Sequence, residues 1–330
     1  MPTFCRHNRF IERCPICSKT LPGNEPAGAS PRRARPASAG RRPAAPRRGG
    51  AGLSVRREGR AAEDGYANGL VAGLRASADA ARLAREIDFA AWRLAALALE
   101  APGLYGEARE LAGTDLERAS WMCVMIAYLG PREDEDPFAS IRAALQAAPG
   151  PAELGSELGA LLDGAALGPR SSHEPGRGAA TLEAYAQWAQ RAGEGSQAAA
   201  LRGDGAWSPE RRFARIFERL ALPGFSRAGR YELLVTLGRL GLYELQADSL
   251  EFGGPGDDTA TVAAKRVFGI ADALLLERRA GALAQAACVP IEALDLALAN
   301  WASPQRATCG FLGAGPPQDR PSEAAAALGV

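Results

Sequence analysis

Apolar residues recur at spacings of three and four positions along most of the chain after residue 64, in segments rich in alanine. This spacing places them on one face of an α-helix. Glycine and proline clusters, for example Ala101–Gly103 and Pro149–Pro151, separate the segments and are typical of helix ends. The pattern therefore predicts a body that is all-α.

Two of these segments carry clear start signals. Thr114 or Asp115 can cap a helix that continues to Gly130 and is apolar on almost every side, so we expect it to lie at the centre of the body. Ser208 followed by Pro209 is typical of a helix start, and the helix after it should bury a stripe of phenylalanine, isoleucine and leucine side chains.

Charge divides the chain into a basic front and an acidic remainder. The whole sequence has 39 lysine and arginine residues against 38 aspartate and glutamate residues. Residues 1–63 nevertheless have a net charge of +10, and residues 64–330 have −9. Residues 24–63 consist mainly of Ala, Gly, Pro and Arg, a composition that predicts a disordered basic tether. Its arginine pairs would be attracted to a polyphosphate backbone, although a merely solubilising linker explains them as well.

Four potential metal ligands lie near the N-terminus: Cys5, His7, Cys14 and Cys17. Three thiolates and one imidazole suit tetrahedral zinc, and the Cys-x-x-Cys spacing lets two sulfurs reach one ion from a tight turn. A shell of four protein ligands leaves no position for a substrate, so residues 1–23 are predicted to form a structural zinc-binding module. A redox-active cysteine pair and chance clustering are the alternatives.

The sequence gives no sign of a membrane partner. It has no apolar stretch near the roughly 18 residues that suggest a membrane span, and its first residues lack the apolar core of a secretion signal. We therefore expect a cytoplasmic protein. Its predicted organisation is a zinc module over 1–23, a tether over 24–63, an all-α body over 64–305 and a flexible C-terminal tail over 306–330.

The most informative stretch surrounds Leu222–Gly224, where a Leu-Pro-Gly motif predicts two helices joined by a tight turn. The second helix would present unpaired backbone N–H groups at its start, and such an end binds phosphate. An extended segment from Tyr243 then leads to Asp257 and Asp258, which stand at the head of a further predicted helix. Leu-Pro-Gly is also a common helix end, so a plain helical corner is the alternative.

This arrangement resembles the helix-hairpin-helix DNA glycosylase superfamily, whose hairpin reads Leu-Pro-Gly-x-Gly-x-x-Thr-Ala and whose catalytic aspartate opens a later helix. The resemblance covers roughly residues 207–302, with the hairpin over 207–240 and the catalytic helix over 257–270. The chain departs from the pattern at Ser226 and Gly229, which stand near the place of the second glycine. Its aspartate lies about ten residues later, and Arg266 falls three residues further on, which is nearly one helical turn.

Three other strings, residues 7–17, 264–270 and 294–301, resemble a narrower family. This family is the predicted α-glutamyl/putrescinyl thymine pyrophosphorylases of clade three, which are helical proteins associated with hypermodified phage DNA. The resemblance implies an all-α fold and double-stranded DNA with modified bases as the partner.

The resemblance also implies that an aspartate near this helix start is catalytic. Breaking an N-glycosidic bond builds positive charge on the deoxyribose, and a carboxylate can stabilise that charge. Asp258 is the first choice because Asp-Thr matches the motif, and Asp257 is the second. Asp248 is the third, because its distance from the Leu-Pro-Gly motif is nearer the usual spacing. The aspartates could instead only cap a helix.

Contacts with the DNA backbone are expected from the hairpin and from the helix after the aspartates. The predicted DNA-binding residues are Gly224, Ser226, Arg227, Gly229, Arg230, Lys265 and Arg266. Lys265 is the only lysine of the body, and no lysine stands at the hairpin position from which bifunctional members of the superfamily attack the sugar. We therefore expect a monofunctional enzyme that releases the base and leaves the strand intact.

The target base must be rotated out of the stack into a pocket of aromatic faces and polar groups. The predicted pocket residues are Tyr128, Arg132, Glu133, Asp134, Asp136 and Trp188, with Tyr185 as a further aromatic candidate. The charged residues directly follow the central helix, where the resembled superfamily places base contacts. Core packing is the alternative for the rings, and a solvated loop is the alternative for the charges.

Together these expectations describe a glycosylase that excises a hypermodified base, glucosylated hydroxymethylcytosine first, from phage DNA and leaves abasic sites as a defence against phage. Two other classes stay open. One is a transferase or pyrophosphorylase in the synthesis of hypermodified thymine, and the other is a non-catalytic DNA-binding protein.

Overall fold

The computed structural model describes residues 61–253, 258–313, 315–316 and 321–330. The chain divides into two units, Met1–Arg56 and Arg57–Val330, and every described residue belongs to the second. The described residues form α-helices and one short 3-10 helix, and none of them forms a strand. This confirms the prediction of an all-α body for the described part of the chain.

The elements in chain order are η3 (Gly69–Val71), α1 (Ser77–Leu99), α2 (Leu104–Ala112), α3 (Leu116–Leu129), α4 (Ala139–Ala147), α5 (Leu158–Asp163), α6 (Ala180–Ala192), α7 (Gln197–Arg202), α8 (Pro209–Arg219), α9 (Arg227–Arg239), α10 (Thr259–Phe268), α11 (Ala273–Ala286), α12 (Ala293–Ala302) and α13 (Glu323–Leu328).

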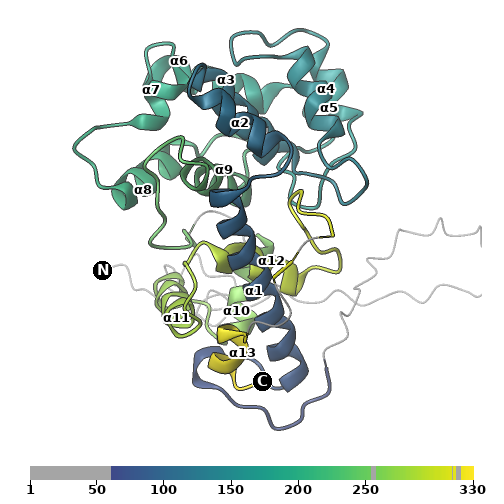
Figure 1. Cartoon of the computed structure of the whole chain (residues 1–330), viewed down its shortest axis with the longest axis vertical. Helices are drawn as coiled ribbons and strands as arrows, with labels where there is room; N and C mark the ends of the chain where they lie inside the picture. The colour runs from purple at the N-terminus through teal and green to yellow at the C-terminus, as the bar shows by residue number, and fades with distance from the viewer. Residues whose placement is uncertain (1–60, 254–257, 314, 317–320) are drawn as a thin grey trace, which may run out of the picture. The chain divides into compact units, whose positions relative to one another are not determined.

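The helices of this unit pack in two groups, which can be followed in Figure 1. In the first group, α3 packs against α2, α4, α7 and α9, and α9 also packs against α8. In the second group, α12 packs against α1 and α10. α11 packs against α10, α12 and α13, and α13 also packs against α1. α1 contacts α9 as well, so it belongs to both groups. The chain therefore returns to the second group through the segment between α9 and α10.

The position of α3 follows from its sequence. Every residue from Ala119 to Leu129 is buried, as expected for a helix that is apolar on almost every side. Asp115 caps the helix by accepting a hydrogen bond from the N–H of Arg118 at 2.9 Å. Gly130 ends it with a φ of 69°, a conformation that favours glycine. The structure thus confirms the predicted central helix.

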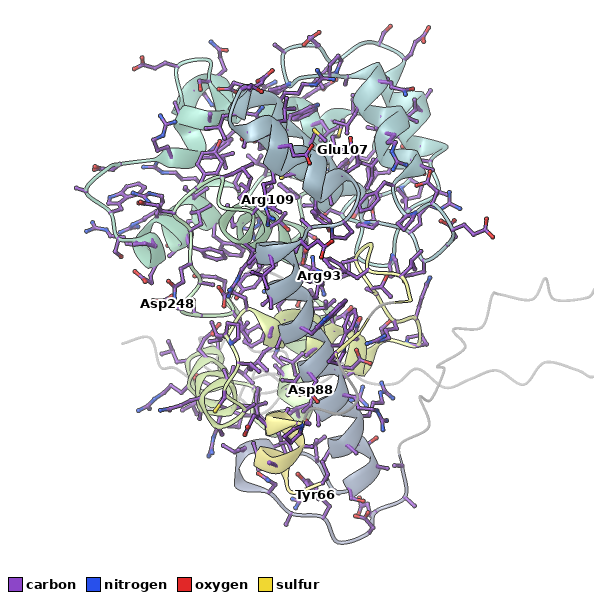
Figure 2. All side chains as sticks on the ribbon, in the orientation of Figure 1. Tyr66, Asp88, Arg93, Glu107, Arg109 and Asp248 are labelled. Carbon is purple, nitrogen blue, oxygen red and sulfur yellow. The ribbon has the colours of Figure 1, made fainter. Side chains whose placement is uncertain are left out.

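A buried ion pair fixes α1 against α9. Arg93 of α1, labelled in Figure 2, is 1% exposed and pairs with Glu232 of α9. Burial alone would lower the pKa of Arg93, but the charge of Glu232 outweighs it and raises that pKa above its usual value. Arg93 therefore stays charged, and its ion pair with Glu232 joins the two groups of helices.

The C-terminal segment differs from the flexible tail that the sequence predicts over 306–330. Among its described residues, Ala307, Cys309 and Phe311 are buried, and Leu328 of α13 is fully buried. The backbone carbonyl of Leu328 also accepts a hydrogen bond from the hydroxyl of Tyr66 at 2.6 Å. The described part of this segment is packed because several of its few apolar side chains reach the core, which composition alone did not indicate.

Candidate functional site

The Leu-Pro-Gly motif forms the turn between α8 and α9. Gly224 has a φ of 81°, and a Cβ atom at this position would collide with the hydroxyl of Thr181, so the turn requires glycine. Ser226 then caps α9 by accepting a hydrogen bond from the N–H of Gly229 at 3.0 Å. The turn therefore gives α9 a fixed and capped N-terminus.

α10 begins at the capping residue Asp258. One oxygen of its carboxylate, Oδ1, accepts hydrogen bonds from the backbone N–H of Thr261 at 2.8 Å and from the Thr261 hydroxyl at 2.7 Å. The other oxygen, Oδ2, accepts a hydrogen bond from Nε of Arg227 at 2.6 Å. Because Arg227 is the first residue of α9, this carboxylate joins the starts of two helices. The Asp258 side chain is still 19% exposed, so a ligand can reach it.

Asp258 and Arg227 belong to a chain of four alternating charges. Nη2 of Arg227 donates a hydrogen bond to Asp295 on α12, and the second carboxylate oxygen of Asp295 accepts one from Arg170, in the loop before α6. The order is thus Arg170, Asp295, Arg227 and Asp258. The two inner side chains, Asp295 and Arg227, are only 3% and 9% exposed, so their attraction is weakly screened by water.

The ionisation of the inner pair follows from this arrangement. Burial alone would raise the pKa of Asp295, but the guanidinium groups of Arg227 and Arg170 outweigh burial and hold that pKa below its usual value. Burial would lower the pKa of Arg227, and the carboxylates of Asp295 and Asp258 instead raise that pKa above its usual value. Both groups therefore stay charged at neutral pH.

A cavity of about 290 Å³ borders Asp258. Its lining includes Ser226 and Ala228 from the start of α9, Thr259 from the start of α10, and Arg170. Helix starts carry unpaired N–H groups and a partial positive charge. The cavity, which we call the Asp258 cavity, therefore combines one carboxylate with two helix N-termini and a guanidinium.

The three predicted catalytic aspartates have different positions. Asp258 caps α10 and lines the Asp258 cavity. Asp248, labelled in Figure 2, is exposed in the segment between α9 and α10. It does not line this cavity. Asp257 lies outside the described residues. Of the two described aspartates, only Asp258 meets the geometric requirement of a carboxylate beside a cavity.

The predicted DNA contacts at the hairpin divide into two kinds. Gly224, Ser226 and Gly229 form the turn and the capped start of α9. Arg227 is held internally by its two carboxylates, and Arg230 is 8% exposed, donates to the carbonyl of Phe217 at 2.8 Å and stacks on its ring. A guanidinium held in this way is not available to an external phosphate, so we assign Arg227 and Arg230 to internal contacts in place of the predicted contacts with DNA.

Lys265 and Arg266, also predicted to contact DNA, lie in the last turn of α10. Both are half-buried, and the guanidinium of Arg266 lies 5.1 Å from the ring centre of Trp301. Neither residue lines the Asp258 cavity. The structure therefore does not bring them to the catalytic candidate.

The aromatic residues predicted for the base pocket lie in the core. The Tyr128 hydroxyl is within hydrogen-bonding distance of Nδ1 of His173, at 2.8 Å, and the Tyr128 ring is 1% exposed. Trp188 packs against Tyr185, and both are buried. None of these three rings lines the Asp258 cavity, so in this structure they have the core-packing role given above as the alternative.

The charged residues predicted for the same pocket lie in the loop after α3. Arg132 pairs with Asp134, and Asp136 accepts a hydrogen bond from Arg142 at 2.7 Å. Glu133 accepts a hydrogen bond from the N–H of Thr308 at 2.6 Å. No residue of this loop lines the Asp258 cavity, although Glu133 ties the loop to the segment after α12 that borders it.

The predicted zinc ligands Cys5, His7, Cys14 and Cys17 lie outside the described residues. Within the residues that the structure describes, no group of three or more His, Cys, Asp or Glu side chains is arranged to hold a metal ion. The zinc module therefore stays a prediction from the sequence.

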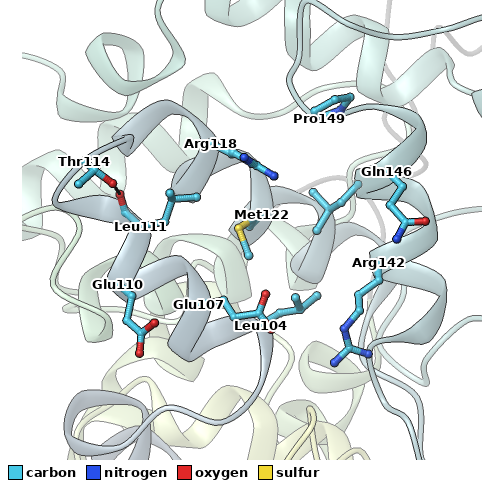
Figure 3. Close-up of a pocket in the computed structure, with 11 residues that line it drawn as sticks. Leu104, Glu107, Glu110, Leu111, Thr114, Arg118, Met122, Arg142, Gln146 and Pro149 are labelled. Atoms are coloured by element: carbon cyan, nitrogen blue, oxygen red, sulfur yellow. Dashed lines mark hydrogen bonds between the residues drawn. The ribbon is translucent and has the colours of Figure 1, made fainter.

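A larger cavity, of about 770 Å³, lies among α2, α3 and α4 (Figure 3). Leu104 and Met122 provide a buried apolar floor. Of its four charged residues, Glu107, Glu110 and Arg118 are exposed to solvent, and Arg142 pairs with the exposed Asp136. Solvent screens such charges, so this cavity lacks the buried charge network of the smaller one.

Sequence reasoning missed Arg170 and Asp295. Asp295 is the one charged residue of α12, whose ten residues are all buried. A lone carboxylate in an apolar helix indicates a buried ion pair, because an unpaired buried charge is strongly disfavoured. That signal was available, but it did not identify the two arginines as partners.

No family model, no curated protein and no solved structure matches this chain. Within the described residues, no helix combines the length and the apolar character needed to cross a membrane. The geometry of the site therefore supplies the structural argument for function.

Proposed function

We propose that the chain is a monofunctional DNA glycosylase of the helix-hairpin-helix type that hydrolyses the N-glycosidic bond of a modified nucleotide. The observation that supports this most is Asp258, which stands at the start of α10 and borders a cavity together with the start of α9. α9 in turn follows the Leu-Pro-Gly turn. One carboxylate and the end of one hairpin thus lie at a single cavity.

Asp258 would act electrostatically. As the C1′–N1 bond lengthens, positive charge develops on the sugar, and a fixed carboxylate stabilises that charge. Two sets of contacts hold the Asp258 carboxylate in place: its hydrogen bonds with Thr261 and its ion pair with Arg227. The partial positive charge of the helix start attracts a negative group at this position. Water then adds to the sugar and completes hydrolysis.

The proposed chemistry needs no amine nucleophile. Lys265 is the only lysine outside the N-terminal segment, and it does not line the Asp258 cavity. Hydrolysis by water is consistent with this arrangement, whereas Schiff-base chemistry would require a lysine amine at the sugar. We therefore expect an abasic site as the product, without a strand break.

DNA would be held at the hairpin by backbone groups. The unpaired N–H groups at the start of α9 and the turn at Gly224 provide donors for a phosphate oxygen. This contact does not use the buried Arg227 and Arg230. The basic tether over 24–63 would add sequence-independent attraction to DNA, and zinc bound by residues 1–23 would stabilise the N-terminal module.

The substrate follows from the resemblance described above. The layout resembles a bacteriophage replication inhibition DNA glycosylase, which implies glucosylated hydroxymethylcytosine in phage DNA as the target and the cytoplasm as the place of action. An enzyme that excised normal bases would damage the genome of its own cell. We therefore propose that recognition depends on the added sugar.

The test measures free base by mass spectrometry after incubation with three duplexes that differ only in plain cytosine, hydroxymethylcytosine or its glucosylated form. Release from the glucosylated duplex alone is expected. Asp258→Asn should abolish most of the release, and Asp248→Asn is the matched control because Asp248 is exposed and away from the cavity. Absence of free base from all three duplexes would refute the proposal, and a new DNA adduct would indicate a transferase instead.

A further inference from the structure

The chain of alternating charges has two open ends, and both border the Asp258 cavity. One end is Asp258, which among the described residues pairs with one arginine, and the other is Arg170, which pairs there with one carboxylate. Both residues line the cavity. The cavity therefore has a negative group and a positive group that belong to one rigid network.

Arg170 has hydrogen-bonding capacity that the described protein does not use. Its side chain is 10% exposed, and its one side-chain hydrogen bond among the described residues runs from Nη2 to Asp295. Its Nε is buried and has no hydrogen-bond partner among these residues. A guanidinium offers five N–H donors, and leaving buried donors unpaired is costly. Because the Arg170 side chain lines the cavity, its remaining Nη donors can bind a ligand oxygen there.

Arg170 stays positively charged, as Arg227 does. Burial alone would lower the pKa of Arg170, but the carboxylate of Asp295 outweighs it and raises that pKa above its usual value. Asp295 also holds Arg227, so the positions of Arg170 and Asp258 are set by shared contacts. A substrate would meet both charges already in place.

We propose that Arg170 is a catalytic residue that donates a hydrogen bond to the O2 atom of the departing pyrimidine, a role that rests on the proposed glycosylase function. The C1′–N1 bond breaks, and its electron pair leaves on the base, where negative charge spreads from N1 to O2. The water oxygen bonds to C1′ and loses a proton, and the base takes up a proton from solvent. The reaction is a hydrolysis and needs no other reactant.

The arrangement favours the departing base over a phosphate as the partner of Arg170. Cleavage of the bond separates a positive sugar from a negative base, and the cavity offers one group of opposite sign for each. A phosphate bound by Arg170, in addition to the one proposed at the hairpin backbone, would bring a second full negative charge into the surroundings of Asp258. Charge that develops only in the transition state is also what a fixed donor stabilises best.

The experiment compares two leaving groups in otherwise identical duplexes: glucosylated hydroxymethylcytosine and glucosylated hydroxymethyluracil. The second carbonyl of the uracil ring spreads the departing negative charge, so this base leaves more easily. Single-turnover base release is measured for the wild type, for Arg170→Gln and Arg170→Lys, and for the control Arg142→Gln, an exposed arginine of the larger cavity.

Arg170→Gln should lose on the order of 100-fold in release of the cytosine base and clearly less in release of the uracil base. Arg170→Lys keeps the positive charge and should show smaller losses, again larger for the cytosine base than for the uracil base. This variant keeps the inference testable if the glutamine variant does not fold. Arg142→Gln should match the wild type.

Equal losses on both bases, accompanied by weaker DNA binding, would show that Arg170 holds a phosphate. This result would overturn the role proposed for Arg170 and leave the proposed glycosylase function standing. Unchanged release by both Arg170 variants would overturn that role as well. A wild type that releases neither base would refute the proposed function, and the role of Arg170 would fall with it.

Discussion

Two cavities of the described body, the one among α2, α3 and α4 and the Asp258 cavity, differ in what surrounds their charged residues. The larger one, among α2, α3 and α4, has exposed side chains such as Glu107 and Arg118. The smaller one has Asp258 and Arg170, each tied into a buried network through Asp295 and Arg227. Fixed charges stabilise a transition state without reorganisation, whereas mobile charges must first be ordered. The comparison teaches that size alone does not identify the site.

The sharpest test of this comparison is Asp258→Asn. Asparagine keeps the capping hydrogen bonds and most of the shape, so α10 should still form. The loss of the negative charge should lower base release by about 100-fold or more. Single-turnover kinetics on glucosylated DNA measures the effect, and DNA affinity should change little. Full activity of this variant would remove Asp258 from the mechanism.

The second test is Asp295→Asn, which removes the central negative charge of the network. It should destabilise the body by about 3–5 kcal/mol, because two buried guanidinium groups lose their shared partner. Urea unfolding at neutral pH measures this loss. Base release should fall as well, since Asp258 and Arg170 lose their common support. A stability equal to that of the wild type would show that the network contributes little.

Stability should also depend on pH through Asp295. The folded-state pKa of Asp295 is depressed, so the ionised carboxylate contributes stability above its unfolded pKa of about 3.9. This contribution is lost as pH falls below that value through the folded pKa. The stability difference between the wild type and Asp295→Asn should therefore shrink in acid. Unfolding curves at a series of pH values measure this difference in stability. A difference that stays constant as pH falls would contradict the prediction.

A third test concerns the predicted zinc ligands, which lie outside the described residues. Cys14→Ser should remove the bound zinc, which elemental analysis of the purified protein detects, because losing one thiolate opens the four-ligand shell. A closed structural shell does not take part in chemistry, so base release by the remaining body should fall by less than about tenfold. Wild-type protein with well under one zinc per chain would refute the zinc module.

The smallest effect is expected at the larger cavity. The double variant Glu107→Gln, Arg118→Gln changes exposed charges of that cavity, and surface charges contribute about 0–1 kcal/mol to stability. Base release should stay within about twofold of the wild type, since preorganised groups at the other cavity are unchanged. A large loss of activity would reverse the comparison and make the larger cavity the functional one.

Local signals were readable from the sequence, and distant pairings were not. The helix starts at Thr114 or Asp115 and at Ser208 were predicted because a cap depends on residues within one turn, and the structure has Asp115 and Ser208 as the caps. The pair between Arg227 and Asp258 spans 31 residues, and the pair between Arg170 and Asp295 spans 125. No local pattern specifies such partners in a chain with 39 basic residues.

The same limit explains why the sequence did not indicate the surroundings of several predicted site residues. Tyr128 was named from its place at the end of a helix, but the packing of the whole first group decides that its ring is buried. Arg227 and Arg230 follow the turn in sequence. A basic residue beside a hairpin is equally consistent with a phosphate contact and with a contact inside the protein, such as those with Asp295 and with the carbonyl of Phe217. Only the tertiary structure distinguishes these cases.

The alternating network also has a consequence for how this protein can change over generations. Replacing any inner member alone leaves a buried charge without its partner, which is more costly than replacing the whole set with apolar residues. Asp295 and Arg227 should therefore be inherited together or lost together among related chains. Co-variation of these two positions, when related sequences are compared, would identify descendants that keep the same network.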